Sequence, residues 1–464
     1  MSQSINTQNL QQLDINTQNL QQLDREHHLH PFTDFHELAE KGSRIIVKAD
    51  GAYIYDSEGN KILDGMSGLW TCALGYGRTE IADAVYQQLQ ELPYYNTFFQ
   101  CAHPASIELA QELTSIAPAH MNNVFFTSSG SEANDTNIRL VLRYWALQDQ
   151  PERKIIIGRK NGYHGSTIAA ASLGGMNGMH KQFNPMPDIE HVDQPYFFGE
   201  GGDLSEDEFG LKAAQSLEAK ILEVGAENVA AFIAEPVQGA GGVVIPPATY
   251  WPEIQRICNE YGILLIVDEV ICGFGRTGEW FGSDTFGIKP DLITFAKAVT
   301  NGYQPLGGVL VGDRVADVLK ADGGEFTHGY TYSGHPAACA AALAVLRIYK
   351  EDKIIERVKE ISPYFCERLK SLADHPLVGE VRAMGMFGAI ELVKNKETRE
   401  RFDSDGATGA LCRDYCVDGG VILRGVGESL ITAPPLTITR DQIDELVEKA
   451  RSALDSAAKD LGVS

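Results

Sequence analysis

Three chemically useful groups each follow a short apolar run in the sequence. The carboxylates of Asp268 and Glu269 end one run, the amine of Lys297 follows another, and a turn of serine and glycine over 128–131 follows a third. A lysine in a desolvated pocket has a lowered pKa and becomes nucleophilic. A turn that starts a helix presents backbone N–H groups to an anion. The three groups therefore predict a chemical site, provided that the fold brings them together.

The elements that would position these groups are short, apolar and rich in β-forming residues. Runs of this kind, separated by helical or irregular stretches, are typical of strands buried on both faces of a largely parallel sheet. They occupy 123–127, 154–158, 229–235, 263–269, 292–296 and 308–312. Helices are predicted over 105–117 and 131–147, and a hairpin is predicted within 44–64. Ligands bind at the carboxyl ends of such strands, so the carboxylate, the amine and the turn would meet at one edge.

At this edge the three groups suit one cofactor, pyridoxal 5'-phosphate (PLP). The turn would bind the phosphate, Lys297 would supply the amine, and Asp268 would keep the pyridine nitrogen protonated so that the ring accepts electrons. Each group also has an ordinary interpretation. Ser129 and Glu132 match the S-x-x-E spacing of a helix cap, an aspartate at a strand end is often only a cap, and a lone lysine is usually solvated. The combination of the three favours the cofactor site.

From about residue 335 the pattern changes to that of a smaller α+β domain. An alanine-rich helix is followed by a candidate strand pair, a helix over 405–418, strands over 420–433 and a terminal helix over 439–460. We predict a flexible N-terminal arm, an N-terminal segment of the small domain, a large PLP-binding domain and a C-terminal small domain. Their predicted bounds are 1–30, 31–70, 71–335 and 336–464.

The N-terminal arm contains the same decapeptide twice. INTQNLQQLD occupies 5–14 and recurs at 15–24. The unit is polar and rich in glutamine and asparagine, and two copies are too few to form a solenoid. We expect a flexible or partly helical arm without a functional role of its own.

Composition is that of a soluble globular protein with an acidic surface. Apolar residues make up 44% and charged residues 22% of the chain, and the formal net charge is −24. Such a charge argues against a nucleic-acid partner and against an anionic membrane surface. The eight cysteines form no CxxC pair and offer no zinc ligand set, so we expect no metal site and free thiols in the cytoplasm. The sequence indicates neither a signal peptide nor a membrane span.

Six motifs in order then give a family resemblance that runs from about 30 to 460. They are SSGSEAND (128–135), NGYHGST (161–167), AEPVQGAGG (234–242), VDEVICGFGRTG (267–278), FAKAVTNGYQPLGG (295–308) and HGYTYSGHP (328–336). The chain resembles the class III aminotransferases, and within them the polyamine:pyruvate branch known as ω-transaminases. The resemblance implies PLP fold type I: a large domain with a mostly parallel seven-stranded sheet, and a small α+β domain.

The resemblance also implies residue roles. Lys297 would carry PLP as a Schiff base and then move the substrate proton, while Asp268 pairs with the pyridine nitrogen. Other implied cofactor contacts are Ser129, Gly130, Ser131, Tyr163, His164, Glu235, Val270 and, from a neighbouring subunit, Thr331. Implied substrate contacts are Leu69, Trp70, Phe98, Phe99, Tyr163, Ala240 and a mobile arginine, Arg424. From the residues alone, His164 is more often a structural histidine than a ligand, Tyr163 is equally plausible as a core aromatic, and Trp70 and Phe98 are ordinary core aromatics.

The implied reaction is ping-pong transamination from a primary amine to a keto acid. The expected donors are putrescine, other diamines or polyamines, or arylalkylamines, with pyruvate as acceptor and an aldehyde or ketone plus L-alanine as products. The alternatives are β-alanine:pyruvate or 4-aminobutyrate transamination, another PLP reaction, and a non-catalytic protein that retains the fold. The intact pair of Lys297 and Asp268 argues against the last. The resemblance further implies a homodimer with shared active sites, with a tetramer as the alternative.

Overall fold

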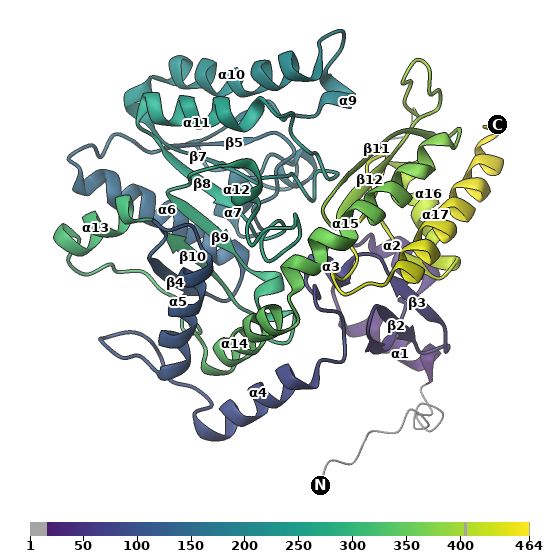
Figure 1. Ribbon diagram of the computed structural model, residues 1–464, viewed down its shortest axis with the longest axis horizontal. Coiled ribbons are helices and arrows are strands. Elements are labelled where there is room, and N and C mark those ends of the chain that lie inside the picture. The colour runs from purple at the N-terminus through teal and green to yellow at the C-terminus, as the bar shows by residue number, and fades with distance from the viewer. Residues whose placement is uncertain (1–15, 403–405, 464) are drawn as a thin grey trace.

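A seven-stranded sheet organises the larger part of the molecule (Figure 1). The structure is a computed structural model that describes residues 16–402 and 406–463. In spatial order the strands are β4 (Asn123–Thr127), β10 (Gly307–Val311), β9 (Leu292–Phe295), β8 (Leu264–Asp268), β7 (Val229–Ala234), β5 (Ile155–Arg159) and β6 (Ile189–Val192). Neighbouring strands from β9 to β6 are parallel, whereas β10 is antiparallel to both β9 and β4. The carboxyl ends of β4, β8 and β9 therefore open at the same edge, as the sequence predicts.

The antiparallel strand β10 has a simple cause. Only residues 296–306 join β9 to β10, and they form a single short helical turn, η3 (Lys297–Thr300). A parallel return needs a longer crossover, usually through an α-helix that packs on the sheet. The chain therefore turns back on itself at this point, which leaves Lys297 at the carboxyl edge.

Helices cover both faces of this sheet. On one face α10 (Glu206–Val224) and α11 (Tyr250–Tyr261) pack on apolar side chains of β5, β7 and β8. On the other face α6 (Gly130–Leu147) and α13 (Asp313–Asp322) pack on the same strands and on β10. Because both faces are covered, the six residues of β7 are all buried.

The smaller part of the molecule contains two four-stranded sheets. One has the order β1 (Ile46–Asp50), β2 (Tyr53–Asp56), β3 (Lys61–Asp64) and β13 (Val421–Ile422). The other has the order β11 (Val378–Met384), β12 (Phe387–Leu392), β15 (Ser429–Thr432) and β14 (Arg424–Val426). The predicted hairpin around SEGN is confirmed as the antiparallel pair β2 and β3. Because β13 pairs with β3, an early and a late segment of the chain share one sheet.

The remaining helices surround these sheets or connect them. They are α1 (Thr17–His27), α2 (Phe35–Lys41), α3 (Ser67–Trp70), α4 (Thr79–Glu91), α5 (Pro104–Ile116), α7 (Ile168–Leu173), α8 (Asn177–His180), α9 (Phe197–Glu200), α12 (Gly282–Phe286), α14 (Pro336–Glu351), α15 (Ile354–Lys370), α16 (Ala407–Asp418) and α17 (Arg440–Leu461), with short turns η2 (Ala226–Asn228) and η4 (Ser371–Asp374). The second decapeptide copy lies mainly in α1, and the first copy lies outside the described residues. No described helix is long and apolar enough to cross a membrane.

Candidate active site

The predicted carboxylate, amine and turn line one cavity of about 430 Å³ at the carboxyl edge of the large sheet. Asp268 is the last residue of β8, Lys297 follows β9, and the turn over 128–131 joins β4 to α6. The implied cofactor residues that line this cavity are Ser129, Gly130, Ser131, Tyr163, His164, Glu235, Asp268, Val270 and Lys297. Segments that are far apart in the sequence thus meet at one place.

Lys297 has an unusual backbone conformation at the start of the loop after β9. Its backbone φ is +53°, a region that residues other than glycine rarely adopt. Its Nζ lies 5.3 Å from the centre of the Trp70 ring. Burial lowers the pKa of Lys297 to about 8, although Asp268 and Glu235 favour the charged amine and Arg424 opposes it. Near neutral pH a useful fraction of this amine is therefore uncharged and able to act as a base.

Asp268 is fixed by three hydrogen bonds. Its Oδ2 accepts from His164 Nδ1 and from Asn134 Nδ2, each at 2.8 Å, and its Oδ1 accepts from the Val270 N–H at 3.1 Å. The imidazole and the amide together leave the carboxylate little freedom to rotate. His164 thus serves a structural purpose here, whether or not it also contacts a cofactor.

Asn134 was not predicted from the sequence. Its Oδ1 accepts from Thr294 Oγ1 at 2.8 Å and from Asn137 Nδ2 at 3.0 Å, so the amide that holds Asp268 is itself held. Asn134 and Asn137 lie three residues apart on the face of α6 that packs on the sheet, and both are buried. The sequence did contain a pattern that could have predicted this role: two asparagines one turn apart among the apolar positions of a helix. Asparagines that are buried at such positions need specific hydrogen-bond partners.

Glu235 forms a second buried carboxyl beside Asp268. Its Oε1 accepts from the Tyr163 N–H at 3.1 Å, and its Oε2 accepts from the Gly239 N–H at 2.8 Å. Burial raises the pKa of Glu235, and the nearby Asp268 raises it further, whereas the Arg159 guanidinium partly opposes the shift. Glu235 thereby fixes the backbone of the loop that carries Tyr163.

The turn before α6 is both a helix cap and an anion cradle. Ser129 Oγ accepts from the Glu132 N–H at 3.2 Å, and Glu132 Oε2 accepts from the Ser128 N–H at 2.7 Å, so the predicted capping spacing is real. Within the described part of the chain, the N–H groups of Gly130 and Ser131 donate to no other residue. A Cβ on Gly130 would lie 3.0 Å from Val270 Cγ2, so the glycine keeps the cradle open. Free N–H groups at the start of a long helix suit a phosphate.

The implied substrate residues are not all in this cavity. The Arg424 guanidinium lies 5.6 Å from the Trp70 ring, the same ring that faces Lys297, so these two cations approach one indole. Leu69 is exposed beside Trp70, and Ala240 is buried. Phe98 and Phe99 instead line a separate cavity of about 860 Å³.

Thr331 also lies apart from Lys297 within one chain, where its carbonyl accepts from Tyr94 Oη at 2.7 Å. It does not line the cavity of Lys297. One chain by itself therefore assembles the cofactor residues but not Phe98, Phe99 or Thr331.

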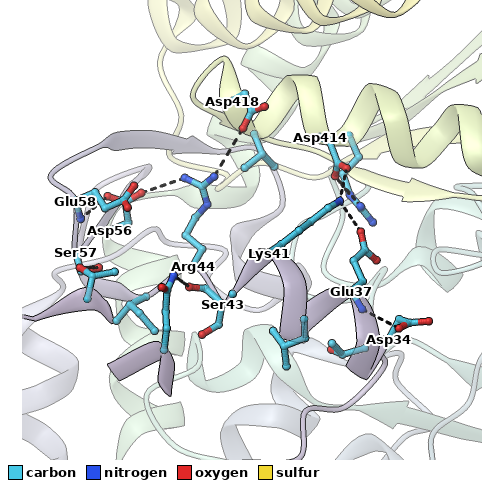
Figure 2. Close-up of a pocket in the computed structure, with 18 residues that line it drawn as sticks. Asp34, Glu37, Lys41, Ser43, Arg44, Asp56, Ser57, Glu58, Asp414 and Asp418 are labelled. Atoms are coloured by element: carbon cyan, nitrogen blue, oxygen red, sulfur yellow. Dashed lines mark hydrogen bonds and ion pairs between the residues drawn. The ribbon is translucent and has the colours of Figure 1, made fainter. Parts of the chain in front are cut away.

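A third cavity, of about 510 Å³, lies between α2, the β1–β2 region and α16 (Figure 2). Its charged side chains pair across the cavity walls: Arg44 with Asp56 at 3.0 Å, and Lys41 with Asp414 at 3.6 Å. None of the predicted site residues lines it. The pair of Lys41 and Asp414 joins the N-terminal segment to α16, and the chemistry-bearing residues lie elsewhere.

Comparison with known proteins agrees with the geometry. The sequence profile of the family described as Aminotransferase class-III matches residues 38–454. This chain belongs to the class III aminotransferases. The chain is 60% identical to a putrescine–pyruvate aminotransferase from Pseudomonas aeruginosa, and the match covers 94% of this chain and 95% of that protein. It is 43% identical to a mitochondrial gamma aminobutyrate transaminase 1 from Solanum lycopersicum, over 93% and 85% of the two chains.

Solved structures agree on the fold of this class III aminotransferase. An ω-transaminase from Pseudomonas jessenii, solved in complex with PMP, superposes with a TM-score of 0.93 at 40% identity and covers 96% of this chain and 99% of that chain. The predicted PLP fold type I is confirmed, and the cofactor of this aminotransferase is PLP. The free N–H groups, the fixed carboxylate and the buried amine of lowered pKa are the groups that such a cofactor requires.

Proposed function

We propose that this aminotransferase moves the amino group of putrescine, or of a similar diamine, to pyruvate. The products are an aminoaldehyde and L-alanine. The observation that carries this proposal is the 60% identity, over nearly the full length of both chains, to a putrescine–pyruvate aminotransferase.

The protein's part in the chemistry is to hold the cofactor and move one proton. When bound, PLP withdraws electrons from the substrate carbon that carries the amine. Lys297 Nζ then takes the proton from that carbon and later returns one, a role suited to an amine whose pKa is about 8. Asp268 would hold the protonated ring nitrogen of the bound cofactor, and His164 and Asn134 keep its carboxylate in place.

Arg424 gives the site a carboxylate-binding group for the keto acid. Among the described residues its guanidinium forms no ion pair, and burial lowers its pKa. A guanidinium without a carboxylate partner beside the Trp70 ring suits the carboxylate of pyruvate. Since a diamine brings no carboxylate, its methylene chain would pack on Trp70 instead.

A second candidate donor is 4-aminobutyrate. The 43% identity to a gamma aminobutyrate transaminase favours it, and Arg424 could bind its carboxylate. One assay distinguishes putrescine from 4-aminobutyrate as the preferred donor. It supplies pyruvate and measures the alanine formed from putrescine, spermidine, 4-aminobutyrate and β-alanine in parallel. We expect putrescine to give the highest kcat/KM, whereas a clear preference for 4-aminobutyrate would replace the first proposal. No alanine from any donor would refute transamination to pyruvate.

We further infer that the enzyme is a homodimer whose subunits complete each other's sites. Phe99, Tyr332 and Tyr95 are 85%, 63% and 51% exposed in one chain, which is unusual for large aromatic side chains. Phe99 also lines the cavity of about 860 Å³, and Thr331 lies beside Tyr332. A second copy packed on this face would bury these rings and bring Thr331 and Phe99 to the partner's cofactor cavity.

Light scattering tests the dimer and also separates it from a tetramer. We expect a dimer for the wild type and monomers with lost activity for Phe99→Asp. The exposed Tyr86→Asp, on α4, is the control for a surface aromatic. A wild-type monomer with full activity would overturn the shared site.

We place the enzyme in the cytoplasm, a proposal supported by its eight free cysteines.

A further inference from the structure

The end of α1 brings three metal-binding side chains together. Asp24, His28 and His30 each offer one ligand atom, and these atoms all lie within 4.8 Å of one another. His28 Nδ1 lies 3.1 Å from Asp24 Oδ1, and His30 Nε2 lies 2.9 Å from both carboxylate oxygens. Both imidazoles therefore direct a nitrogen at one carboxylate.

We propose that Asp24, His28 and His30 bind one divalent first-row transition metal ion, for which Zn²⁺ is the probe. Two imidazole nitrogens and one carboxylate oxygen are a ligand set that such ions prefer. Ligands about 2.1 Å from a tetrahedral zinc lie about 3.4 Å apart. The observed separations reach this value after small shifts, and the fourth position is open to water because the His28 side chain is 61% exposed.

The local fold explains how these residues converge. Asp24 lies on the last turn of α1, and His28 is the residue that caps the end of this helix. The His28 backbone N–H donates to the Asp24 carbonyl, which keeps the two residues next to each other. The helix ends at His27, and the chain then reverses far enough for His30 to reach the same carboxylate. The site joins the helix end to the segment that leads to α2, and it is separate from the cavity of Lys297.

A bound metal ion would stabilise α1, which packs no buried side chain against the rest of the protein. The helix has eleven residues and none of them is buried, and a helix of that length is marginal on its own. Side-chain hydrogen bonds tie it to its neighbours, from Thr17 Oγ1 to Ser57, from Gln21 to the Ser43 carbonyl and from Arg25 to the Ala39 carbonyl. A ligand that binds only the folded helix end would shift this segment toward the ordered state.

The cysteines of the sequence led us to expect no metal site, and the proposed site differs from that expectation because it uses histidine and aspartate ligands. Sequence spacing alone did not indicate the site, because Asp24 and the two histidines converge only through the turn after α1. The neighbouring His27 is 72% exposed on its side chain and lies outside the set, so it provides a matched control.

The test uses the untagged holoenzyme dialysed against a fixed free concentration of Zn²⁺, with bound zinc measured by elemental mass spectrometry. We expect one zinc per chain for the wild type and for His27→Ala. Asp24→Asn and His30→Ala should bind at least about tenfold more weakly, with transaminase activity unchanged in all four proteins. Hydrogen exchange over 16–30 should slow with Zn²⁺ in the first two proteins only.

Two results would overturn the proposal. Equal zinc in all four proteins would place the metal on other groups, such as the free thiols. No bound zinc in the wild type at micromolar Zn²⁺ would show that Asp24 and the histidines form hydrogen bonds only.

Discussion

The amine of Lys297 leads to a quantitative prediction about stability. Its pKa falls from 10.5 to about 8, with burial as the main cause. One pKa unit corresponds to about 1.4 kcal/mol, so folding with a charged Lys297 costs at most about 3.5 kcal/mol in the cofactor-free protein. Lys297→Met keeps most of the side-chain volume and removes the charge. Cofactor-free Lys297→Met should therefore be more stable than cofactor-free wild type by up to about 3.5 kcal/mol.

The pH dependence of this difference follows from the two pKa values. Below about pH 8 the amine is charged in both the folded and the unfolded state, so the full cost is present. Between pH 8 and 10.5 the folded state has already released its proton, so the cost shrinks and then disappears. Urea unfolding at equal protein concentration, at pH 7 and at pH 10, measures the difference.

The control for this experiment is Lys289→Met, because Lys289 is exposed. Its free energy of unfolding should differ from that of the wild type by less than about 0.5 kcal/mol at both pH values. A Lys297→Met protein that is no more stable than the wild type at pH 7, or an advantage that grows with pH, would show that the buried charge of Lys297 does not destabilise the folded state.

Three further substitutions test single contacts. Arg424→Ala should raise the KM for pyruvate at least about tenfold in steady-state kinetics, with a smaller change for putrescine, because it removes the carboxylate partner; equal changes would place the carboxylate elsewhere. Asn134→Leu removes one donor to Asp268 and leaves buried partners unpaired, so it should lower the free energy of unfolding by about 1–3 kcal/mol and speed PLP release, measured by absorbance after gel filtration; unchanged retention would show that Asn134 does not orient Asp268. Gly130→Ala places a Cβ 3.0 Å from Val270 and should weaken PLP binding in equilibrium dialysis, whereas Gly178→Ala, where nothing lies within 4 Å and the backbone φ is not positive, controls for the loss of a glycine.

Much of the large domain could be predicted because its strands are buried on both faces. The strands β4, β8 and β9 are apolar runs with polar residues directly after them, and parallel geometry places those ends together. The strand β6 (Ile189–Val192) was not among the predicted runs, because it is a short edge strand that contains Glu190 and His191. The helix α15 was also not predicted, although its buried positions recur at helical spacing.

The parts of the site that could not be predicted depend on long-range packing. Trp70 and Arg424 are more than three hundred residues apart, and only the folded chain brings the guanidinium to the indole that faces Lys297. Asn134 gave a weak signal because a polar residue on a helix is usually solvated. The convergence of Asp24 with His28 and His30 depends on a turn whose geometry the composition does not determine.

Lys297 is the residue that we propose to hold PLP and to perform the proton transfer. The most direct test is to treat the holoenzyme with sodium borohydride and map the modified peptide by mass spectrometry. We expect the pyridoxyl mass on the peptide that contains Lys297 and nowhere else, and none on Lys297→Ala. Modification of a different lysine in the wild type, or turnover retained by Lys297→Ala, would contradict this proposal.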